Sequence, residues 1–499
     1  MKDNLKRLCE ACKEDDIETV KSLLVAVSVY EDERRDQGDL MDRPELQQTS
    51  PFFVACEYER LDILCLFMDS MLFDINRRHA GWTPLCLAAA NGHLGVARML
   101  IASPFIDISK ESNGCTPLCI SCEEGHVEIV KLILAHESSN INVESENGCT
   151  PLCVCCEDGN IEILEVLLED KRIDVNRGNV DGTTPLIKAC GAGQKQVVDI
   201  LLSRPDIGVN TADRSGETPL FAAAENGHID IVRTLLLHKD LDPTVGGEKN
   251  AFIKSWEKGF HEVSALILYH TLFDPNQQVG GSGFLHFAVT HSDRELLSLV
   301  LSHPRTDVNL LNTDRSTALF QTCCSGNTEF ARLLLQHPNV DVNCVSVGDH
   351  TPLQMASTSD SPNLVSLLLS HPLIQVNRGD DTGWTALHYA SSLSFVEIVR
   401  EILKCPLTNP NVSSLDGFTP LGLACDEGNV DIVKLLLQHH MTDVNLQSGS
   451  STPLQLCCKN QNAIILRLFL SHPRLSSSSF CCALHSRERA LSVSSSSRP

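Results

Sequence analysis

The chain has 499 residues, a hydrophobic content of 42% and a formal net charge of −24, from 64 acidic and 40 basic residues. This hydrophobic content excludes a disordered chain, and the acidic balance disfavours nucleic-acid backbones and anionic membranes as partners. The sequence contains no apolar core of a signal peptide and no run approaching the roughly 20 residues of a membrane span, so we expect a cytoplasmic protein without membrane insertion.

The first part of the chain predicts a helix pair followed by a loop. Residues 5–24, LKRLCEACKEDDIETVKSLL, fit two helices of the kind that recur later, without the extended segment that joins later pairs. We therefore interpret residues 1–30 as an N-terminal capping half-repeat. Residues 31–48 are strongly charged and are expected to form a loop.

From residue 49 onwards the chain is periodic. Thr-Pro-Leu, or a variant of it, recurs at steps of 32 to 34 residues over thirteen copies. Such a steady period predicts one solenoid of stacked units rather than several globular domains. The unaltered motif begins at Thr83, Thr116, Thr150, Thr184, Thr218, Thr351, Thr419 and Thr452.

Each unit is predicted to form a helix, a turn, a second helix and an extended finger. The Thr is a good N-cap, the Pro fits the first helical position, and a Gly nine residues after the Thr suits a left-handed residue that ends the helix. Because non-glycine residues replace this Gly mainly past residue 290, we predict that the C-terminal half is less stable. The replacements are Glu59, Ser292, Asp360, Ser394 and Gln461.

Composition divides the periodic region into parts. Repeats are expected at 49–243 and 284–472, whereas 244–283 loses the motif, contains Gly pairs and places Trp256 where other repeats have a small residue. This divergent segment predicts altered stacking with a possible bend, and its alternatives are a hinge or recognition irregularity, or two drifted but packed repeats. Residues 473–499 are Ser-rich and predict a disordered tail.

The repeats resemble the ankyrin family. The matching strings include GWTPLCLAAANGHLGVARMLIAS (81–103) and GFTPLGLACDEGNVDIVKLLLQH (417–439), and the resemblance covers roughly residues 4–472. It implies an all-α ankyrin-repeat solenoid of helix–turn–helix units with short β-hairpin-like fingers. The fourth residue of the family motif is usually His, which only His286 and His388 retain, so the Thr–His contact is expected to be mostly absent.

Two Cys-x-x-Cys pairs, Cys119/Cys122 and Cys153/Cys156, have the spacing of a zinc or redox site. In repeat register, however, the second Cys of each pair stands where other units have Cys, Ala or Ser, as expected for a small buried residue. Equivalent residues of adjacent repeats lie about 10 Å apart, too far to share a zinc ion or a disulfide. We therefore predict structural thiols and no metal site. The alternative is redox sensing by partly exposed Cys115, Cys119, Cys149 or Cys153.

The resemblance implies that finger tips and the ends of the first helices line a concave binding face. Acids and aromatic residues occupy these positions, and four acids cluster across two repeats at 123–124 and 157–158. They indicate a partner with basic or extended segments, unless the acids merely solvate a polar face and the Trp residues only pack. The predicted partner-binding residues are Trp82, Glu123, Glu124, Glu157, Asp158, Glu225, Trp384, Phe418, Asp426 and Glu427, with Glu57 and Tyr58 at the same positions.

The sequence contains no nucleophile-elbow, Walker or Rossmann fingerprint. We expect no enzyme and no cofactor, but a monomeric, non-catalytic protein-binding scaffold or adaptor. Two alternatives stay open, a thiol-rich redox or metal sensor and an adaptor that recruits clients to a ubiquitin ligase or kinase complex.

Overall fold

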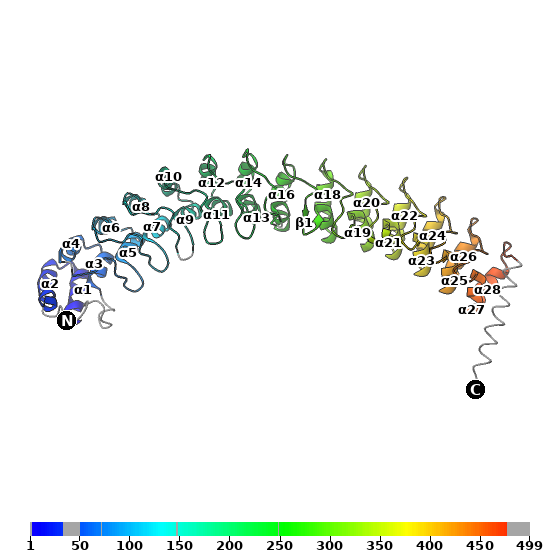
Figure 1. Ribbon diagram of the computed structural model, residues 1–499, viewed down its shortest axis with the longest axis horizontal. Coiled ribbons are helices and arrows are strands. Elements are labelled where there is room, and N and C mark those ends of the chain that lie inside the picture. The colour runs from blue at the N-terminus through cyan, green and yellow to red at the C-terminus, as the bar shows by residue number, and fades with distance from the viewer. Residues whose placement is uncertain (1, 33–49, 71, 146–147, 248, 477–499) are drawn as a thin grey trace, which may run out of the picture. The chain divides into compact units, whose positions relative to one another are not determined.

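The computed structural model describes residues 2–32, 50–70, 72–145, 148–247 and 249–476 (Figure 1). The chain divides into two compact units, residues 1–273 and 274–499, which we describe separately as unit 1 and unit 2. Most of the predicted loop at 31–48 and of the predicted tail at 473–499 lies outside the described residues. The second helix ends at Asp32 and so extends two residues past the expected boundary at residue 30.

Unit 1 contains eight helix pairs among its described residues. Their bounds are α1 Lys2–Glu14, α2 Ile17–Asp32, α3 Pro51–Glu57, α4 Leu61–Ser70, α5 Pro84–Asn91, α6 Leu94–Ile101, α7 Pro117–Glu123, α8 Val127–Leu134, α9 Pro151–Asp158, α10 Ile161–Glu169, α11 Pro185–Ala192, α12 Lys195–Leu202, α13 Pro219–Glu225, α14 Ile229–Leu236, α15 Ala251–Glu257 and α16 His261–Leu268.

Unit 2 contains six helix pairs among its described residues. Its elements are β1 Gln278–Val279, β2 Ser282–Gly283, α17 Phe284–Thr290, α18 Arg294–Ser302, α19 Ala318–Ser325, α20 Thr328–Leu335, the 3₁₀ turn η3 Val347–Asp349, α21 Pro352–Thr358, α22 Pro362–Leu369, α23 Ala386–Ser392, α24 Val396–Lys404, α25 Pro420–Asp426, α26 Val430–Gln438, α27 Pro453–Lys459 and α28 Ala463–Leu470.

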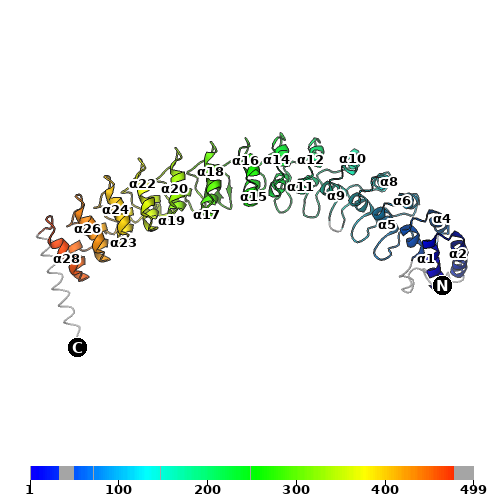
Figure 2. The same cartoon turned by 180° about the vertical axis from the view of Figure 1, so that it is seen from behind.

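In each unit the odd-numbered helices form one row and the even-numbered helices form another, as the two opposite views show (Figures 1 and 2). Neighbouring helices contact one another along each row, as α7 contacts α5 and α9, and the two helices of a repeat also contact each other. From α10 to α11, for example, a finger joins an even helix to the next odd helix. This arrangement confirms the predicted all-α repeat architecture. In such an architecture each repeat contacts its neighbouring repeats.

The fingers contain little regular strand. Among the described residues, only β1 and β2 form a ladder, an antiparallel pair with Gln278 opposite Gly283. Three further finger turns of the described residues are closed by single bridges, such as the one between His79 and Trp82. The predicted hairpin-like character is therefore limited to short turns at finger tips.

Capping of the odd helices follows the sequence prediction. The Thr83, Thr116 and Thr150 hydroxyls each accept a hydrogen bond from the backbone N–H three residues later, at 3.2 Å. These Thr residues are buried, so an N-cap that typically contributes about 1 kcal/mol is repeated along the row. The Leu two residues after each Thr is also buried, and burial of one such side chain stabilises the fold by roughly 2 kcal/mol.

The turn after each odd helix also adopts the predicted conformation. Gly92, Gly159 and Gly326 have φ between +70° and +80°, the left-handed region that glycine enters without strain. The non-glycine replacements take the same conformation, and this places a strained residue at each of those turns. Their φ angles are 56° for Glu59, 53° for Ser292, 48° for Asp360, 62° for Ser394 and 55° for Gln461.

Asparagine side chains join adjacent repeats at the base of the fingers. Asn176, for example, donates through Nδ2 to the Asp206 carbonyl at 2.7 Å and accepts through Oδ1 from the Gly208 N–H at 2.7 Å. Ten asparagines make both bonds to the following repeat of their own unit, so each acts as a two-point link. They are Asn76, Asn142, Asn176, Asn210, Asn276, Asn309, Asn343, Asn377, Asn411 and Asn445.

Ser109 stands at one of these link positions, and its hydroxyl bonds Asp107 of its own finger at 2.6 Å. A cavity of about 20 Å³ lies beside it, lined among others by Ser109, Ser138 and Asn140, and the buried hydroxyl of Ser139 makes no hydrogen bond there. The cavity has room for about one water molecule. The shorter side chain thus leaves a polar gap between two repeats.

We predict that Ser109→Asn stabilises unit 1. The amide restores two hydrogen bonds to the next repeat and fills the cavity, for a gain of about 1 kcal/mol. The reverse change at an intact link, Asn176→Ser, is the matched control and is expected to lose a similar amount. Chemical denaturation of the full chain measures both, and a destabilising Ser109→Asn would contradict the polar gap inferred between these repeats.

The divergent segment at 244–283 contains a complete helix pair. Trp256 of α15 is 7% exposed and its ring lies 4.1 Å from that of His261 in α16, measured between centroids. The Phe252 and Phe273 rings pack at 5.6 Å. At Trp256, an aromatic side chain therefore fills the space that a small residue occupies in other repeats. The boundary between the two units falls inside this segment.

Candidate functional site

The candidate site in unit 1 consists of the ends of the odd helices and the finger tips beside them. Unit 1 contains 45 acidic and 26 basic residues, a net charge of −19, and unit 2 contains 19 and 14, a net charge of −5. The fingers of unit 1 extend from the side of the odd-numbered row (Figures 1 and 2). The acidic character of the chain is therefore concentrated in the unit that carries most of the predicted acids.

Of the four acids predicted to cluster across α7 and α9, one forms an ion pair with a lysine. Glu123 and Glu124 are exposed, and within the described part of the chain neither forms an ion pair. Glu157, by contrast, lies 3.0 Å from Lys188 Nζ of α11. Partial burial, together with the charge of Glu157, raises the pKa of the Asp158 carboxyl. The uncompensated negative charge thus centres on α7 and on Asp158.

The remaining predicted acids lie at equivalent helix ends but in different surroundings. Glu225 Oε1 lies 3.6 Å from Lys254 Nζ, and Asp426 accepts from the Asn460 amide at 3.2 Å. Glu57, Tyr58 and Glu427 are exposed. Lys188 and Lys254, the partners of Glu157 and Glu225, lie on the next odd helix. The sequence prediction missed them because it considered the acids without the residues of the following repeat.

The predicted aromatic residues lie at finger tips. Trp82 and Trp384 are half-buried, and Phe418 is 38% exposed. The backbone of Trp82 exchanges hydrogen bonds with that of His79 at 2.8 and 3.0 Å, which closes its finger tip. In unit 2, Val347 and Leu415, at the tips of the fingers before α21 and α25, are 65% and 80% exposed. The finger between them has the exposed Asp381 at the equivalent place.

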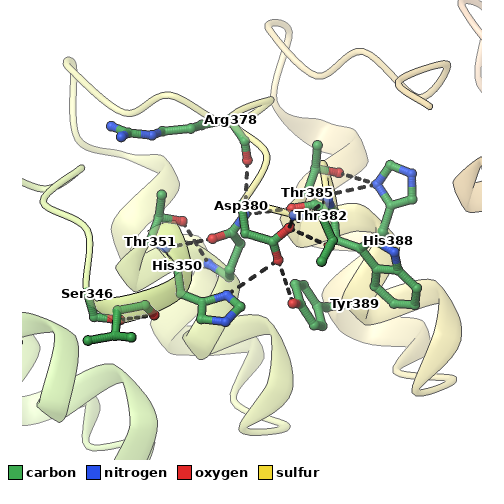
Figure 3. A network of polar contacts seen from close by, with 12 residues as sticks. Ser346, His350, Thr351, Arg378, Asp380, Thr382, Thr385, His388 and Tyr389 are labelled. Carbon is green, nitrogen blue, oxygen red and sulfur yellow. Dashed lines mark hydrogen bonds and ion pairs between the residues drawn. The ribbon is translucent and has the colours of Figure 1, made fainter. Parts of the chain in front are cut away.

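Asp380 lies in a polar network that sequence reasoning missed (Figure 3), and the Trp384 N–H takes part in it. The Asp380 side chain is fully buried and accepts from the Thr382 N–H at 2.9 Å, the Thr382 hydroxyl at 2.6 Å and the Trp384 N–H at 2.9 Å. Its second oxygen accepts from the Tyr389 hydroxyl at 2.6 Å. His350 Nδ1, from the preceding finger, lies 3.3 Å from the same oxygen.

These contacts fix the ionisation of Asp380 and the position of two rings. Burial opposes the charge, but hydrogen bonds from Thr382, Tyr389 and Trp384 outweigh it and lower the pKa of Asp380. Burial and the adjacent carboxylate raise the pKa of Tyr389, so its phenol stays protonated. The Trp384 and Tyr389 rings lie 5.2 Å apart, and their relative position is thereby preorganised.

The cysteines of the two Cys-x-x-Cys pairs are buried. Cys122 and Cys156 are 0% exposed, as predicted for a small residue between helices. The expectation of partial exposure was wrong for Cys119 and Cys153, which are 3% and 0% exposed because the next finger covers them. Only Cys115 and Cys149 of that set are half-buried.

Cys119 and Cys153 occupy the place that His388 holds in its repeat. His388 connects Thr385 Oγ1 at 2.8 Å to the Phe418 carbonyl at 3.0 Å in the next repeat. The Cys119 and Cys153 thiols reach the equivalent carbonyls, those of Cys149 and Thr183, at 3.9 and 3.8 Å. A thiol is a weak donor, so it keeps the connection in a weaker form.

Native-state alkylation is expected to distinguish these thiols from exposed ones. Burial raises the pKa of Cys119 to about 12 and also raises that of Cys153, and only the thiolate reacts. We predict that a short iodoacetamide pulse at pH 8 labels exposed Cys65 at least 100-fold faster than either. Peptide mass spectrometry measures the ratio. Equal labelling of Cys119 and Cys65 would instead favour the redox-sensor alternative.

Neither a metal cluster nor a membrane span is present in the part of the chain that the structure describes. Within these ranges, no three His, Cys, Asp or Glu side chains are grouped to hold a metal ion. None of the helices described has the length and apolar composition needed to cross a bilayer.

Comparison with known families agrees with this geometry. The family model for ankyrin repeats, built on three copies, matches residues 8–111, 105–179, 171–246, 285–380, 339–413, 372–448 and 396–478. The chain belongs to the ankyrin-repeat family. A search of curated proteins gave no match. Ankyrin repeats generally serve as scaffolds for protein–protein interaction, and the stretch between the matched ranges, 247–284, contains the aromatic helix pair of α15 and α16.

In two repeats that lack the His of the ankyrin motif, a Gln makes the hydrogen bond to the capping Thr instead. Gln354 accepts from the Thr351 N–H at 2.6 Å and donates to the Trp384 carbonyl at 2.6 Å, which reproduces the His388 connection. The Thr452 N–H likewise bonds Gln455 Oε1 at 2.8 Å. Side chains without a polar group stand at this place in the repeats with Ile187, Phe221 and Gly422, where the contact is lost as expected.

Proposed function

We propose that this ankyrin chain is a non-catalytic scaffold that binds a protein partner through its finger tips and odd-helix ends. The observation that carries the proposal is the pair Glu123 and Glu124, exposed and without an ion pair in the described structure. They come after Cys119 and Cys122 of α7, whose side chains are buried in the core. Exposed acids that neither pack nor pair are available to a partner.

The partner is proposed to carry basic, extended segments. The net charge of −19 in unit 1 attracts a cationic chain over a distance of about one Debye length, roughly 8 Å in physiological salt. In unit 2, the rings of Trp384 and Tyr389 add apolar contact area of the kind enriched in binding hot spots. Twenty described cysteines without a disulfide support a reducing compartment, and we propose the cytoplasm.

Affinity capture from native cells tests the proposal. We expect Glu123→Lys/Glu124→Lys to lose partners that the wild-type chain retains, with losses that shrink as salt is raised. The matched control is Glu162→Lys/Glu165→Lys on α10, which makes the same charge change at exposed positions in the even row. Circular dichroism verifies that both variants fold. The same partner set for all three proteins would refute binding at α7.

A further inference from the structure

A second candidate surface lies on the loops that lead from the even helices into the fingers of unit 2. One position in this loop, two residues before the finger segment of each repeat, is occupied by Leu373, Leu407 and Met441 in three consecutive repeats. These side chains are 68%, 65% and 53% exposed. The same position holds Arg305 and Asn339 before them and Arg474 after them. We call Leu373, Leu407 and Met441 the apolar row.

The backbone of the apolar row is held in place by the asparagine links. Asn343, Asn377 and Asn411 donate to the carbonyls of Leu373, Leu407 and Met441, each at 2.7 Å. Each asparagine also accepts a hydrogen bond from the backbone N–H two residues after the apolar one, at 2.7 to 2.9 Å. Three apolar side chains are therefore presented from fixed points, which lowers the entropy lost on binding.

Folding of unit 2 does not account for these residues. A side chain that stays more than half exposed gains little from burial, and three consecutive repeats of unit 1 have Arg172, Asp206 and Asp240 at the same position. Single exposed leucines are ordinary on protein surfaces. Three in register, preceded by exposed Pro372 and Pro406 and by exposed His440, form an uncharged strip instead, and such strips mark binding sites.

The spacing and the charge identify the occupant. Adjacent repeats are separated by about 10 Å, the diameter of a helix, and an α-helix advances about 10.5 Å over seven residues. At the end of the row, the Arg474 guanidinium donates to the carbonyls of His440 at 2.7 Å and Thr442 at 3.3 Å, so a fixed positive charge lies next to Met441. Neutral carbonyls leave that charge available to a carboxylate.

We propose that the apolar row binds an amphipathic helix of a second protein, with apolar residues seven apart and a carboxylate one helical turn beyond the last of them, facing Arg474. Recognition by apolar anchors at helical spacing is a common mode of peptide binding. The row shares no residue with the finger-tip and odd-helix site, so the proposal goes beyond the function proposed above. Two separate surfaces would let one chain hold two different proteins.

A synthetic helix tests the proposal with the full chain. The probe is a fluorescein-labelled 24-residue peptide with Leu at positions 3, 10 and 17, Glu at position 21, and Ala, Gln and Lys elsewhere. Fluorescence anisotropy is expected to show saturable binding that Leu407→Asp weakens at least tenfold. Leu272→Asp is the matched control, since Leu272 is 58% exposed at the same loop position in unit 1, and it should leave binding unchanged.

Two further arms separate this surface from others. A peptide with its leucines five residues apart should bind at least tenfold more weakly, and Arg474→Glu should weaken binding several-fold, with recovery when position 21 of the peptide is Lys. Absence of saturable binding, or binding that ignores Leu407→Asp, would overturn the proposal. Sedimentation that shows a dimer of the chain, dissociated by Leu407→Asp, would make a second copy the occupant and would also overturn it.

Failure of binding at the apolar row is distinguishable from failure of the scaffold function. Glu123→Lys/Glu124→Lys should leave probe binding unchanged, because these acids are in unit 1. Conversely, Leu407→Asp should retain the partners that depend on Glu123 and Glu124.

Discussion

Asp380→Ala is expected to destabilise unit 2 by about 3 kcal/mol, a large loss for a single substitution. The carboxylate is fully buried and accepts from Thr382, Trp384 and Tyr389. Alanine leaves two backbone N–H groups and a phenol without their acceptor. A fully buried unpaired donor costs about 1 to 3 kcal/mol, and these donors are partly buried, so we expect about 1 kcal/mol for each. The network connects a finger to the helix that follows it, so the loss is local to these repeats.

Hydrogen exchange of the full chain measures this loss. Peptides that cover the finger at 379–385 and α23 should exchange about 100-fold faster in Asp380→Ala, the factor that corresponds to about 3 kcal/mol. The matched control is Asp381→Ala, which removes the neighbouring, exposed carboxylate and should change exchange by less than threefold. Equal effects of the two changes would contradict the assigned role of Asp380.

The contribution of Asp380 also has a defined pH dependence. Its folded pKa is lowered, so the stabilisation is present above the unfolded pKa, about 3.9, and is lost as the pH falls through the folded value. The difference in stability between wild type and Asp380→Asn should therefore be constant from pH 7 to pH 5. It should shrink below pH 4.

Glycine at four turns is expected to stabilise unit 2 by about 3 to 4 kcal/mol in total. Ser292, Asp360, Ser394 and Gln461 hold φ angles of 48° to 62°, which cost a non-glycine residue about 1 kcal/mol each. The four turns belong to different repeats, so the gains should add. The same strain supports our prediction that unit 2 is less stable than unit 1.

Urea denaturation and hydrogen exchange of the fourfold variant test this expectation. The matched control is Ser366→Gly, at an exposed position in the middle of α22, where glycine should instead cost about 0.5 kcal/mol. If the fourfold variant were no more stable than the wild type, strain at these turns would not limit the stability of unit 2.

The repeat architecture could be predicted because its signals are local. The Thr cap, the Pro that follows it and the turn glycine each act within one helix, and they recur at a fixed step. The burial of Cys122 and Cys156 followed from repeat register alone. These features confirm that period and capping chemistry determine the elements of this fold.

Contacts between repeats were less accessible to sequence reasoning. Asp380, Tyr389 and His350 lie apart in sequence, and no motif distinguishes this finger from the others. Lys188 neutralises Glu157 from the next repeat, so counting acids within one repeat overestimated the negative charge. The asparagine links had a visible signal, since Asn recurs at ten finger positions, but their partners lie in the following repeat.

Binding of a partner by the finger tips and odd-helix ends is tested most directly by hydrogen exchange of the full chain. The exchange is measured for the chain alone and with a partner that wild type captures and Glu123→Lys/Glu124→Lys does not. We predict protection in the fingers around α7 and α9 and at the C-terminal ends of these helices, with α8 and α10 unchanged. Protection confined to α8 and α10 would contradict binding at this site.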